Sequence, residues 1–182
     1  GASKVLRGID FRMEEGERIA IMGPSGSGKS TLLNCIGGID RPDNGEILFE
    51  DLSLTGLTEQ ELCELRRKKI STIFQFFHLL PTLTTRENIE FPMLLNSIGK
   101  SERNEKVDEL LNAVKIHHRA CAFPHELSGG EKQRVAIARS LSMQPKLILA
   151  DEPTGNLDSK NTDSVLELIE NLSKQHGIAM LL

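Results

Sequence analysis

The glycine-rich stretch at residues 23–31 restricts the possible folds more than any other part of the sequence. It matches the pattern G-x-x-x-x-G-K-[ST] in full. In that pattern small residues let backbone N–H groups surround phosphates, the lysine places its charge at the β- and γ-phosphates, and the hydroxyl that follows can bind Mg²⁺. The residues of the stretch are Gly23, Pro24, Ser25, Gly26, Ser27, Gly28, Lys29, Ser30 and Thr31. We therefore predict that this loop binds a nucleoside triphosphate.

The segments beside this loop have the character that the motif requires. Residues 17–22 are expected to form a short buried strand, and residues 29–36 a helix that stops at Gly37 and Gly38. Such a helix directs its free N–H groups and its positive dipole end at a bound anion. A flexible Gly/Ser turn is the alternative interpretation, which the flanking strand and helix disfavour.

Composition limits the class of protein. The 182 residues suit one domain, or one domain with a subdomain, and the net charge of −4 argues against a broad nucleic-acid-binding surface. The basic run at residues 66–69 is interpreted as a solvated helix end. The 3 cysteines are far apart, which predicts buried or half-buried thiols and neither a disulfide framework nor a metal site.

No apolar run reaches the roughly 18 residues that a membrane-spanning helix needs, and no signal peptide is visible. We therefore expect a cytoplasmic protein unless a partner tethers it. The chain begins with Gly1 and ends at Leu182 within the apolar run 178–182. We interpret the sequence as a fragment of a longer protein.

Strand-like and helix-like runs alternate along the chain, which favours an α/β fold with a mainly parallel sheet. Residues 84 to about 126 differ, because helical signals dominate there and predict a small helical lobe inserted between strands. The apolar stripe of this lobe comprises Val107, Leu110, Leu111 and Val114. Further strands are expected at 46–49, 70–74, 147–150 and from Ile178, and further helices from the Thr58–Glu61 capping box to Lys69 and from about 160 to 175.

Two carboxylates, Asp151 and Glu152, follow the apolar strand expected at residues 147–150. In parallel α/β sheets ligands bind outside the carboxyl ends of the strands, so this pair should lie on the same edge as the phosphate loop. Asp151 can then hold Mg²⁺, and Glu152 can act as a general base on water or orient it. A solvated acid pair is the alternative, disfavoured by Lys29 and Ser30.

Residues 127–131 form a second helix start with unusual composition, since a Gly-Gly pair follows Ser128. Ser128 and Glu131 predict a capping box for a helix that runs to about Ser142. Each glycine in a helix costs about 1 kcal/mol relative to alanine, so a purely structural helix would not place both there. The pair lets an anion approach the N–H groups, although a plain capped helix remains the alternative.

Together these residues closely resemble the nucleotide-binding domain of ATP-binding-cassette (ABC) proteins, whose signature is Leu-Ser-Gly-Gly-(Gln/Glu). The resemblance implies a P-loop NTPase core with a mainly parallel sheet, an inserted helical subdomain and an N-terminal antiparallel β portion. In this chain the core would comprise residues 1–83 and 143–182, and the helical subdomain residues 84–142. The signature residues here are Leu127, Ser128, Gly129, Gly130 and Glu131.

The same resemblance implies the cofactors, the partners and the roles of further residues. ATP and Mg²⁺ would bind, with Ser30, Gln75 and Asp151 as metal ligands. Lys29, Gln75 and Glu152 would form the catalytic set. Two domains would pair as a homodimer in which each signature closes over the other's ATP and Asp158 reaches across. A transmembrane subunit or fused membrane domain would hold the protein at the inner face of the membrane, and no nucleic acid would bind.

Two features of the family are missing from this sequence. The aromatic residue that stacks on adenine lies in a loop, whereas Phe11 falls in the strand region and Tyr and Trp are absent. The family's switch histidine follows the strand that starts at Ile178, so it would fall just beyond Leu182. We interpret both as truncation and expect the fragment to bind nucleotide with weak or absent hydrolysis. The histidines that do not fit the switch position are His78, His117, His118, His125 and His176.

The apolar loop at residues 76–81 either packs the joint between sheet and lobe or lines a groove for a helix of a membrane subunit. With residues 86–92 it resembles the branch of the family that handles lipoprotein release and macrolide-type export. An energy-coupling ATPase of a transport complex is the leading hypothesis. A nucleic-acid motor is disfavoured by net charge and by the lack of coiled-coil or zinc modules, and a regulatory module without turnover is disfavoured by Glu152.

Overall fold

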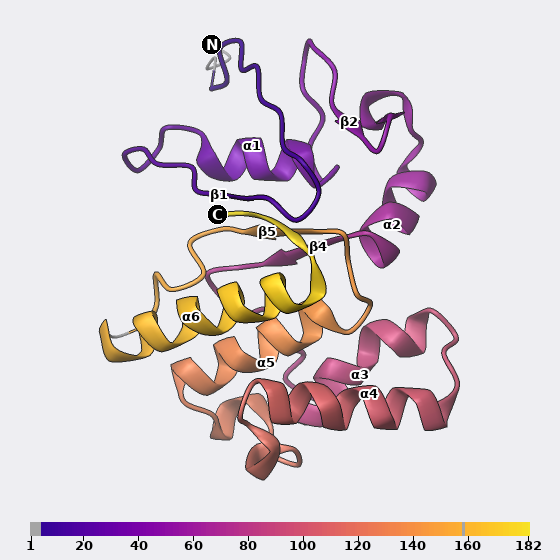
Figure 1. The fold of residues 1–182 in the computed structure, drawn as a ribbon, viewed down its shortest axis with the longest axis vertical. Coiled ribbons are helices and arrows are strands. Elements are labelled where there is room, and N and C mark those ends of the chain that lie inside the picture. The colour runs from indigo at the N-terminus through magenta and orange to yellow at the C-terminus, as the bar shows by residue number, and fades with distance from the viewer. Residues whose placement is uncertain (1–4, 158) are drawn as a thin grey trace.

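A parallel sheet divides the molecule into two layers of helices in the computed structural model, which describes residues 5–157 and 159–182 (Figure 1). In space the strands follow the order β1-β6-β5-β4, and every neighbouring pair is parallel. The order means that the last strand of the chain lies between the first strand and β5. The strands are β1 (Arg18–Ile19), β4 (Ile70–Ile73), β5 (Leu147–Ala150) and β6 (Ala179–Leu181).

Helices cover both faces of this sheet. Figure 1 shows α1 on one face and α5 and α6 on the other. The α-helices are α1 (Lys29–Ile36), α2 (Glu59–Lys68), α3 (Thr85–Leu95), α4 (Lys100–Ala113), α5 (Gly129–Leu141) and α6 (Ser159–His176). The short 3₁₀ turns are η1 (Leu54–Gly56), η2 (His117–Arg119) and η3 (Pro124–Glu126). The alternation predicted from the sequence is therefore confirmed as an α/β fold with helices on two sides.

A small antiparallel sheet accompanies the parallel one. It consists of β2 (Leu48–Phe49) and β3 (Leu52–Ser53), joined by Glu50 and Asp51, which both adopt positive φ. The Glu50 carboxylate accepts hydrogen bonds from Lys69 at 2.5 Å and from Lys146, and these bonds lower the pKa of Glu50. The hairpin is thereby attached to the residues that precede β4 and β5.

Alternation along the buried strands divides the core in two. In β5, Ile148 and Ala150 pack with α5 and α6, whereas Leu147 and Leu149 pack with Leu33 of α1 and with α2. This follows from the period of two in a strand, where successive side chains point to opposite faces. A sheet covered on both faces needs continuous apolar strands, which explains why all four residues of β5 are buried.

The helical region between β4 and β5 has the apolar stripe expected of it. Val107, Leu110, Leu111 and Val114 are all buried, and α5 contacts both α4 and β4. Capping boxes precede two of the helices. Thr84 pairs with Glu87 before α3 of this region, and Thr58 pairs with Glu61 before α2.

The exposure of the cysteines corrects one expectation. Cys35 is buried in α1, and this burial is the main cause of the raised pKa of its thiol, but Cys63 and Cys121 are exposed. Cys63 lies on α2 one residue after the buried Leu62, and a step of one residue turns a side chain by about 100° around a helix axis. Among the described residues no helix has both the length and the apolar character to cross a bilayer.

Candidate nucleotide-binding site

Three segments that the sequence singled out follow strands of the same sheet. The phosphate loop follows β1, Gln75 follows β4, and Asp151 follows β5. Because these strands are parallel, their carboxyl ends lie at one edge, where ligands of α/β sheets bind. The register pairs Ile73 with Ala150, so the segments after β4 and β5 begin side by side.

The phosphate loop leaves the first turn of α1 without a side-chain cap. Its N-cap residue Gly28 has φ 97°, and within residues 5–157 and 159–182 no side chain bonds the N–H groups of the first turn. Gly26 also has a positive φ of 78°, a conformation that glycine adopts without the steric cost other residues carry. The Lys29 ammonium donates hydrogen bonds to the Gly23 carbonyl at 2.9 Å and the Pro24 carbonyl at 3.1 Å. Uncapped N–H groups beside a lysine are suited to an anion.

Ser30 and Asp151 meet, although 121 residues separate them in the chain. The Ser30 hydroxyl donates to Asp151 Oδ1 at 3.0 Å. A hydroxyl and a carboxylate oxygen are hard ligands of the kind that Mg²⁺ prefers when it also binds phosphate oxygens. In the described part of the chain no cluster of His, Cys, Asp or Glu forms an all-protein metal cage. The two oxygens therefore fit a magnesium ion that the nucleotide helps to hold.

Glu152 follows Asp151 and is exposed at the same edge. Its φ is 44°, in the left-handed region that residues other than glycine seldom adopt. Its carbonyl accepts a hydrogen bond from the Gly155 N–H at 2.9 Å, which closes a turn behind it. Uncommon backbone conformations of this kind cluster at functional sites, where surrounding structure holds them.

Gln75 is held by the loop that follows Glu152. Asn156 donates its side-chain amide to the Gln75 carbonyl at 2.8 Å. Gly155 lies so close that a Cβ added there would be 2.7 Å from Gln75 Nε2. Glycine at position 155 thus makes room for the Gln75 side chain, and the loops after β4 and β5 form one unit.

The signature segment begins α5 in the manner predicted. The Ser128 hydroxyl accepts from the Glu131 N–H at 3.3 Å, and Glu131 Oε2 accepts from the Ser128 N–H at 2.7 Å. That backbone bond is the main reason why the pKa of Glu131 is lowered, and Arg119 and His118 add to the effect. Ser128 is exposed, Gly129 half-buried, and Leu127 and Gly130 buried.

Arg139 is a residue of this region that the sequence interpretation missed. From α5 its guanidinium donates to the His78 carbonyl at 2.5 Å and the Phe77 carbonyl at 2.8 Å. Phe77 and His78 have φ of 47° and 45°, so the loop after Gln75 is held in an uncommon conformation. Burial lowers the pKa of Arg139. A cation directly after the apolar run 135–138 was the signal that could have identified it.

The two segments that the sequence predicts to bind phosphate are not bonded to each other within one molecule. Helices α1 and α5 lie on opposite faces of the sheet (Figure 1). Over the described ranges 5–157 and 159–182, no hydrogen bond or ion pair joins residues 23–31 to residues 127–131. Gly129 instead faces its own chain, where an added Cβ would lie 3.5 Å from Leu157 Cδ2. Asp158, proposed from the sequence for a dimer contact, lies outside the described residues.

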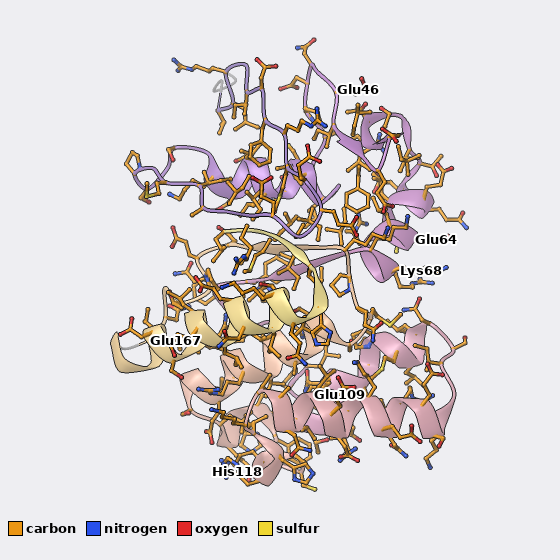
Figure 2. The ribbon with its side chains drawn as sticks, viewed as in Figure 1. Glu46, Glu64, Lys68, Glu109, His118 and Glu167 are labelled. Carbon is orange, nitrogen blue, oxygen red and sulfur yellow. The ribbon has the colours of Figure 1, made fainter. Side chains whose placement is uncertain are left out.

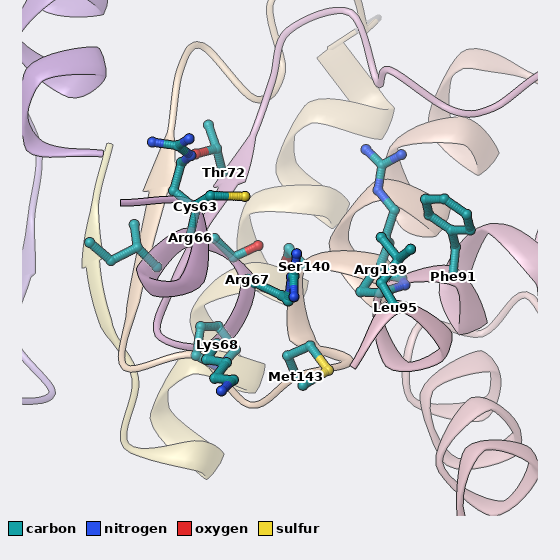
Figure 3. Close-up of a pocket in the computed structure, with 14 residues that line it drawn as sticks. Cys63, Arg66, Arg67, Lys68, Thr72, Phe91, Leu95, Arg139, Ser140 and Met143 are labelled. Carbon is teal, nitrogen blue, oxygen red and sulfur yellow. The ribbon is translucent and has the colours of Figure 1, made fainter. Parts of the chain in front are cut away.

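A pocket of about 340 Å³ opens away from the phosphate loop, between α2 and the helices α3 and α5 (Figure 3). Arg139 lines it, which connects the pocket to the loop after Gln75. The exposed Cys63 also borders it. The α2 side is basic and the α3 side apolar, through Arg66, Arg67 and Lys68 on α2 and Phe91, Pro92 and Leu95 on α3.

Comparison with known proteins agrees with this geometry. The family model described as ABC transporter matches residues 6–155. The ATP-binding cassette MJ0796 in a dimeric, post-hydrolysis state bound to ADP and Pi is 40% identical, with a TM-score of 0.88, over 97% of this chain and 78% of that chain. A second dimeric structure of MJ0796, a bacterial ABC transporter cassette, is 40% identical with a TM-score of 0.87, over 97% of this chain and 79% of that chain. CbiO1 from Clostridium perfringens, part of the ABC transporter complex CbiONQ, is 32% identical with a TM-score of 0.88, over 97% of this chain and 70% of that chain.

Proposed function

Because this chain belongs to the ABC transporter family, whose cassettes are ATPases that bind ATP with Mg²⁺, we propose that it powers a membrane transport complex by ATP-driven dimerisation. The observation that carries the proposal is the hydrogen bond between Ser30 and Asp151, which joins the phosphate loop to a strand-end carboxylate. Residues 1–83 and 143–182 act as the ATP-binding core, and residues 84–142 as the helical subdomain.

The phosphate loop binds the triphosphate of ATP. The uncapped N–H groups at the start of α1 and the Lys29 ammonium face the phosphate oxygens, supported by the positive φ of Gly28 and by the carbonyl bonds that locate Lys29. Ser30 and Asp151 would hold Mg²⁺, with Gln75 as a further ligand from the neighbouring loop. When bound, Mg²⁺ supplies positive charge at the phosphate oxygens.

Hydrolysis is a displacement at the γ-phosphorus. Glu152 accepts a proton from a water molecule as the water oxygen forms its bond to the γ-phosphorus. The bond between that phosphorus and the β–γ bridging oxygen breaks, and ADP leaves with the electron pair. Lys29 donates to the oxygens on which charge increases. The exposed position of Glu152 beside Asp151 supports this role.

A second copy of the chain completes the site. Among the described residues no hydrogen bond or ion pair joins the two helix starts, and two copies related by a twofold axis can each present the start of α5 to the other's phosphate loop. The dimeric state of the related cassette MJ0796 supports this pairing. Each dimer would then hold two ATP molecules between Lys29 of one copy and Ser128 of the other, and Asp158 would extend the contact.

The pocket between α2 and α3 is the site where the membrane partner docks. Its basic side and apolar side suit a segment of that partner with an acidic side chain beside apolar ones, since opposite charges complement each other across interfaces. Phe76, which follows Gln75 and is 66% exposed, is a further apolar side chain that the partner would contact. Docking there would place the protein at the cytoplasmic face of the membrane, in a complex of the lipoprotein-release or macrolide-export type.

Single-turnover hydrolysis at high protein concentration tests the ATPase mechanism, because only weak steady-state hydrolysis is expected of residues 1–182. Replacing Glu152 with Gln removes the base, so the rate of phosphate release with Mg-ATP should fall about 10²–10⁴-fold. ATP should then accumulate in a stable dimer, visible by gel filtration. Unchanged turnover would contradict the role of Glu152, and a variant that stays monomeric at saturating ATP would contradict ATP-driven dimerisation.

Two native cysteines test the docking site in purified membrane complexes. Cys63 borders the pocket, whereas Cys121 is exposed in the helical lobe and serves as the matched control. Maleimide labelling of Cys63 should slow in the complex relative to the isolated chain, with Cys121 labelled at the same rate in both. Equal labelling of Cys63 in both states would contradict docking at this pocket.

A further inference from the structure

The start of α5 carries a negative charge, which opposes the binding of a phosphate there. Glu131 lies in its first turn, and its carboxylate accepts a hydrogen bond from the Ser128 N–H at 2.7 Å. A carboxylate in this position stabilises the helix. The same negative charge repels a triphosphate that approaches Ser128 from outside.

Arg119 lies against this carboxylate from a segment that precedes the helix. Its Nε is 3.3 Å from Glu131 Oε1, and its guanidinium also donates to the Glu126 carbonyl. The side chains of Arg119 and Glu131 are 34% and 27% exposed, so water screens the pair only in part. The buried Nε–H is not aligned with the carboxylate for a hydrogen bond, which makes the contact an ion pair.

Other charges near the pair do not provide the same neutralisation. His118 also acts on Glu131, but it contributes less than Arg119 does, and it is exposed at the outer end of the lobe (Figure 2). Arginine keeps its charge at every pH at which the protein is folded. Arg119 is therefore the cation that offsets Glu131 under assay conditions.

We propose that Arg119 positions and neutralises Glu131, so that the start of α5 can accept the γ-phosphate of ATP bound to a second copy of the chain. The proposal rests on the dimeric site proposed above. Arg119 and Glu131 form a matched pair, in which the arginine is needed only because the capping residue is charged.

This dependence separates the proposal from a purely structural role. If Arg119 only stabilised the fold, its loss would have the same effect whichever residue occupied position 131. If Arg119 neutralises Glu131, its loss matters with glutamate and much less with glutamine, because glutamine can still accept from the Ser128 N–H but carries no charge. A double-mutant cycle measures this difference.

The cycle is measured in the full chain with Glu152→Gln, which traps ATP. The readout is the Mg-ATP concentration that gives half-maximal dimer at pH 8, by sedimentation velocity, alongside ATP affinity of the dilute monomer. With Glu131 present, Arg119→Gln should raise the half-maximal concentration about tenfold, equivalent to 1.4 kcal/mol. With Glu131→Gln, the same substitution should raise it less than about twofold. Monomer affinity should not change, because the phosphate loop is remote.

Arg103 provides the matched control within the same lobe. It also pairs with a carboxylate, Glu90 at 2.7 Å, and donates to a backbone carbonyl, that of Ile98 at 2.5 Å. Arg103→Gln should therefore reproduce the loss of an ion pair without altering the charge at the signature, and should leave ATP-driven dimerisation unchanged.

An equal loss with and without Glu131, or no loss in either, would overturn the proposal. If Arg119→Gln does not fold, Arg119→Lys replaces it. Because lysine keeps the charge, the half-maximal Mg-ATP concentration should stay within about threefold of the parent. A tenfold increase in that concentration would also overturn the proposal. A separate variant tests the dimeric site itself. If the start of α5 does not contact the partner's ATP, Gly129→Asp should leave ATP-driven dimerisation intact whichever residue occupies position 119.

Discussion

Two helix starts in this protein are suited to phosphate, and they are capped in different ways. Helix α1 begins at Gly28, where no side chain of the described residues bonds the first-turn N–H groups. Helix α5 begins at Ser128 with a complete capping box, so one of its first-turn N–H groups is already bonded to a side chain. Lys29 adds a positive charge at the first start, whereas Glu131 adds a negative one at the second.

The difference indicates a division of labour. The start of α1 has no donor occupied by a side chain of the described residues, so it is suited to bind a nucleotide in a single molecule. The start of α5 has one donor fewer, so in the dimeric site proposed above its contact with a phosphate would be weaker and would require a second molecule to supply the nucleotide. A weak second contact would allow the proposed dimer to open again after hydrolysis.

The largest expected effect comes from the first helix start. Lys29→Ala should abolish the stabilisation that Mg-ATP gives at 100-fold excess over its Kd, about 2.7 kcal/mol, and should lower turnover by at least about 10²-fold. Thermal melts with and without Mg-ATP measure the first effect. An equal shift in melting temperature on adding Mg-ATP to wild type and variant would rule out residues 23–31 as the binding site.

The second helix start should affect dimerisation and leave binding intact. Gly129→Asp adds a negative charge where a Cβ meets only ordinary contacts, so the monomer should fold and bind ATP. ATP-driven dimerisation of the Glu152→Gln protein should fall about 10-fold or more. Gly99→Asp is the matched control, since Gly99 is the N-cap of α4 and an added Cβ meets no neighbour. Equal effects of both substitutions would contradict the assignment.

The link between the two regions should give a smaller effect. Arg139→Met removes the bonds from α5 to the loop after Gln75, so kcat should fall about tenfold while the KM for ATP changes little. Arg134→Met is the control, because Arg134 donates from the same helix to Val114 and Ser164 instead. Equal losses of kcat would show that Arg139 acts only through stability.

The smallest effect concerns pH. The folded protein lowers the pKa of Glu131, so the stabilisation from this carboxylate is fully present above the pKa of the unfolded state and is lost as pH falls through the lower pKa of the folded state. Near pH 7 the free energy of unfolding of wild type, measured by urea melts, should exceed that of Glu131→Gln by about 0.3–1 kcal/mol. The difference should shrink as pH falls toward 3, and a difference independent of pH would contradict the assigned cause.

Local patterns predicted much of the fold and of the candidate site. The phosphate loop, the Ser128–Glu131 capping box and the stripe on α4 each depend on residues a few positions apart, and the structure has all three. Long-range contacts could be predicted only where a general rule applied. The rule that ligands bind at the carboxyl edge of a parallel sheet predicted that Asp151 lies near the phosphate loop, and Ser30 bonds it there. The insertion of β6 between β1 and β5 depends on how distant segments pack and was not predicted.

Residues that support the site were harder to predict, because their partners are backbone carbonyls. Arg139 donates to the backbone carbonyls of Phe77 and His78, which lie 62 and 61 residues away. Every residue has a carbonyl, so the sequence does not indicate which one is bonded. Arg119 lies only seven residues before Glu126, whose carbonyl it bonds, but its pairing with Glu131 depends on the turns between them. Such contacts become visible only when the chain is folded.

A crystal structure of the Glu152→Gln protein with Mg-ATP tests the central claim most directly. The account predicts a twofold dimer in which each γ-phosphate lies within hydrogen-bond distance of Lys29 of one protomer and Ser128 of its partner. A nucleotide bound away from residues 23–31, or a dimer in which Ser128 faces solvent or its own chain, would contradict it.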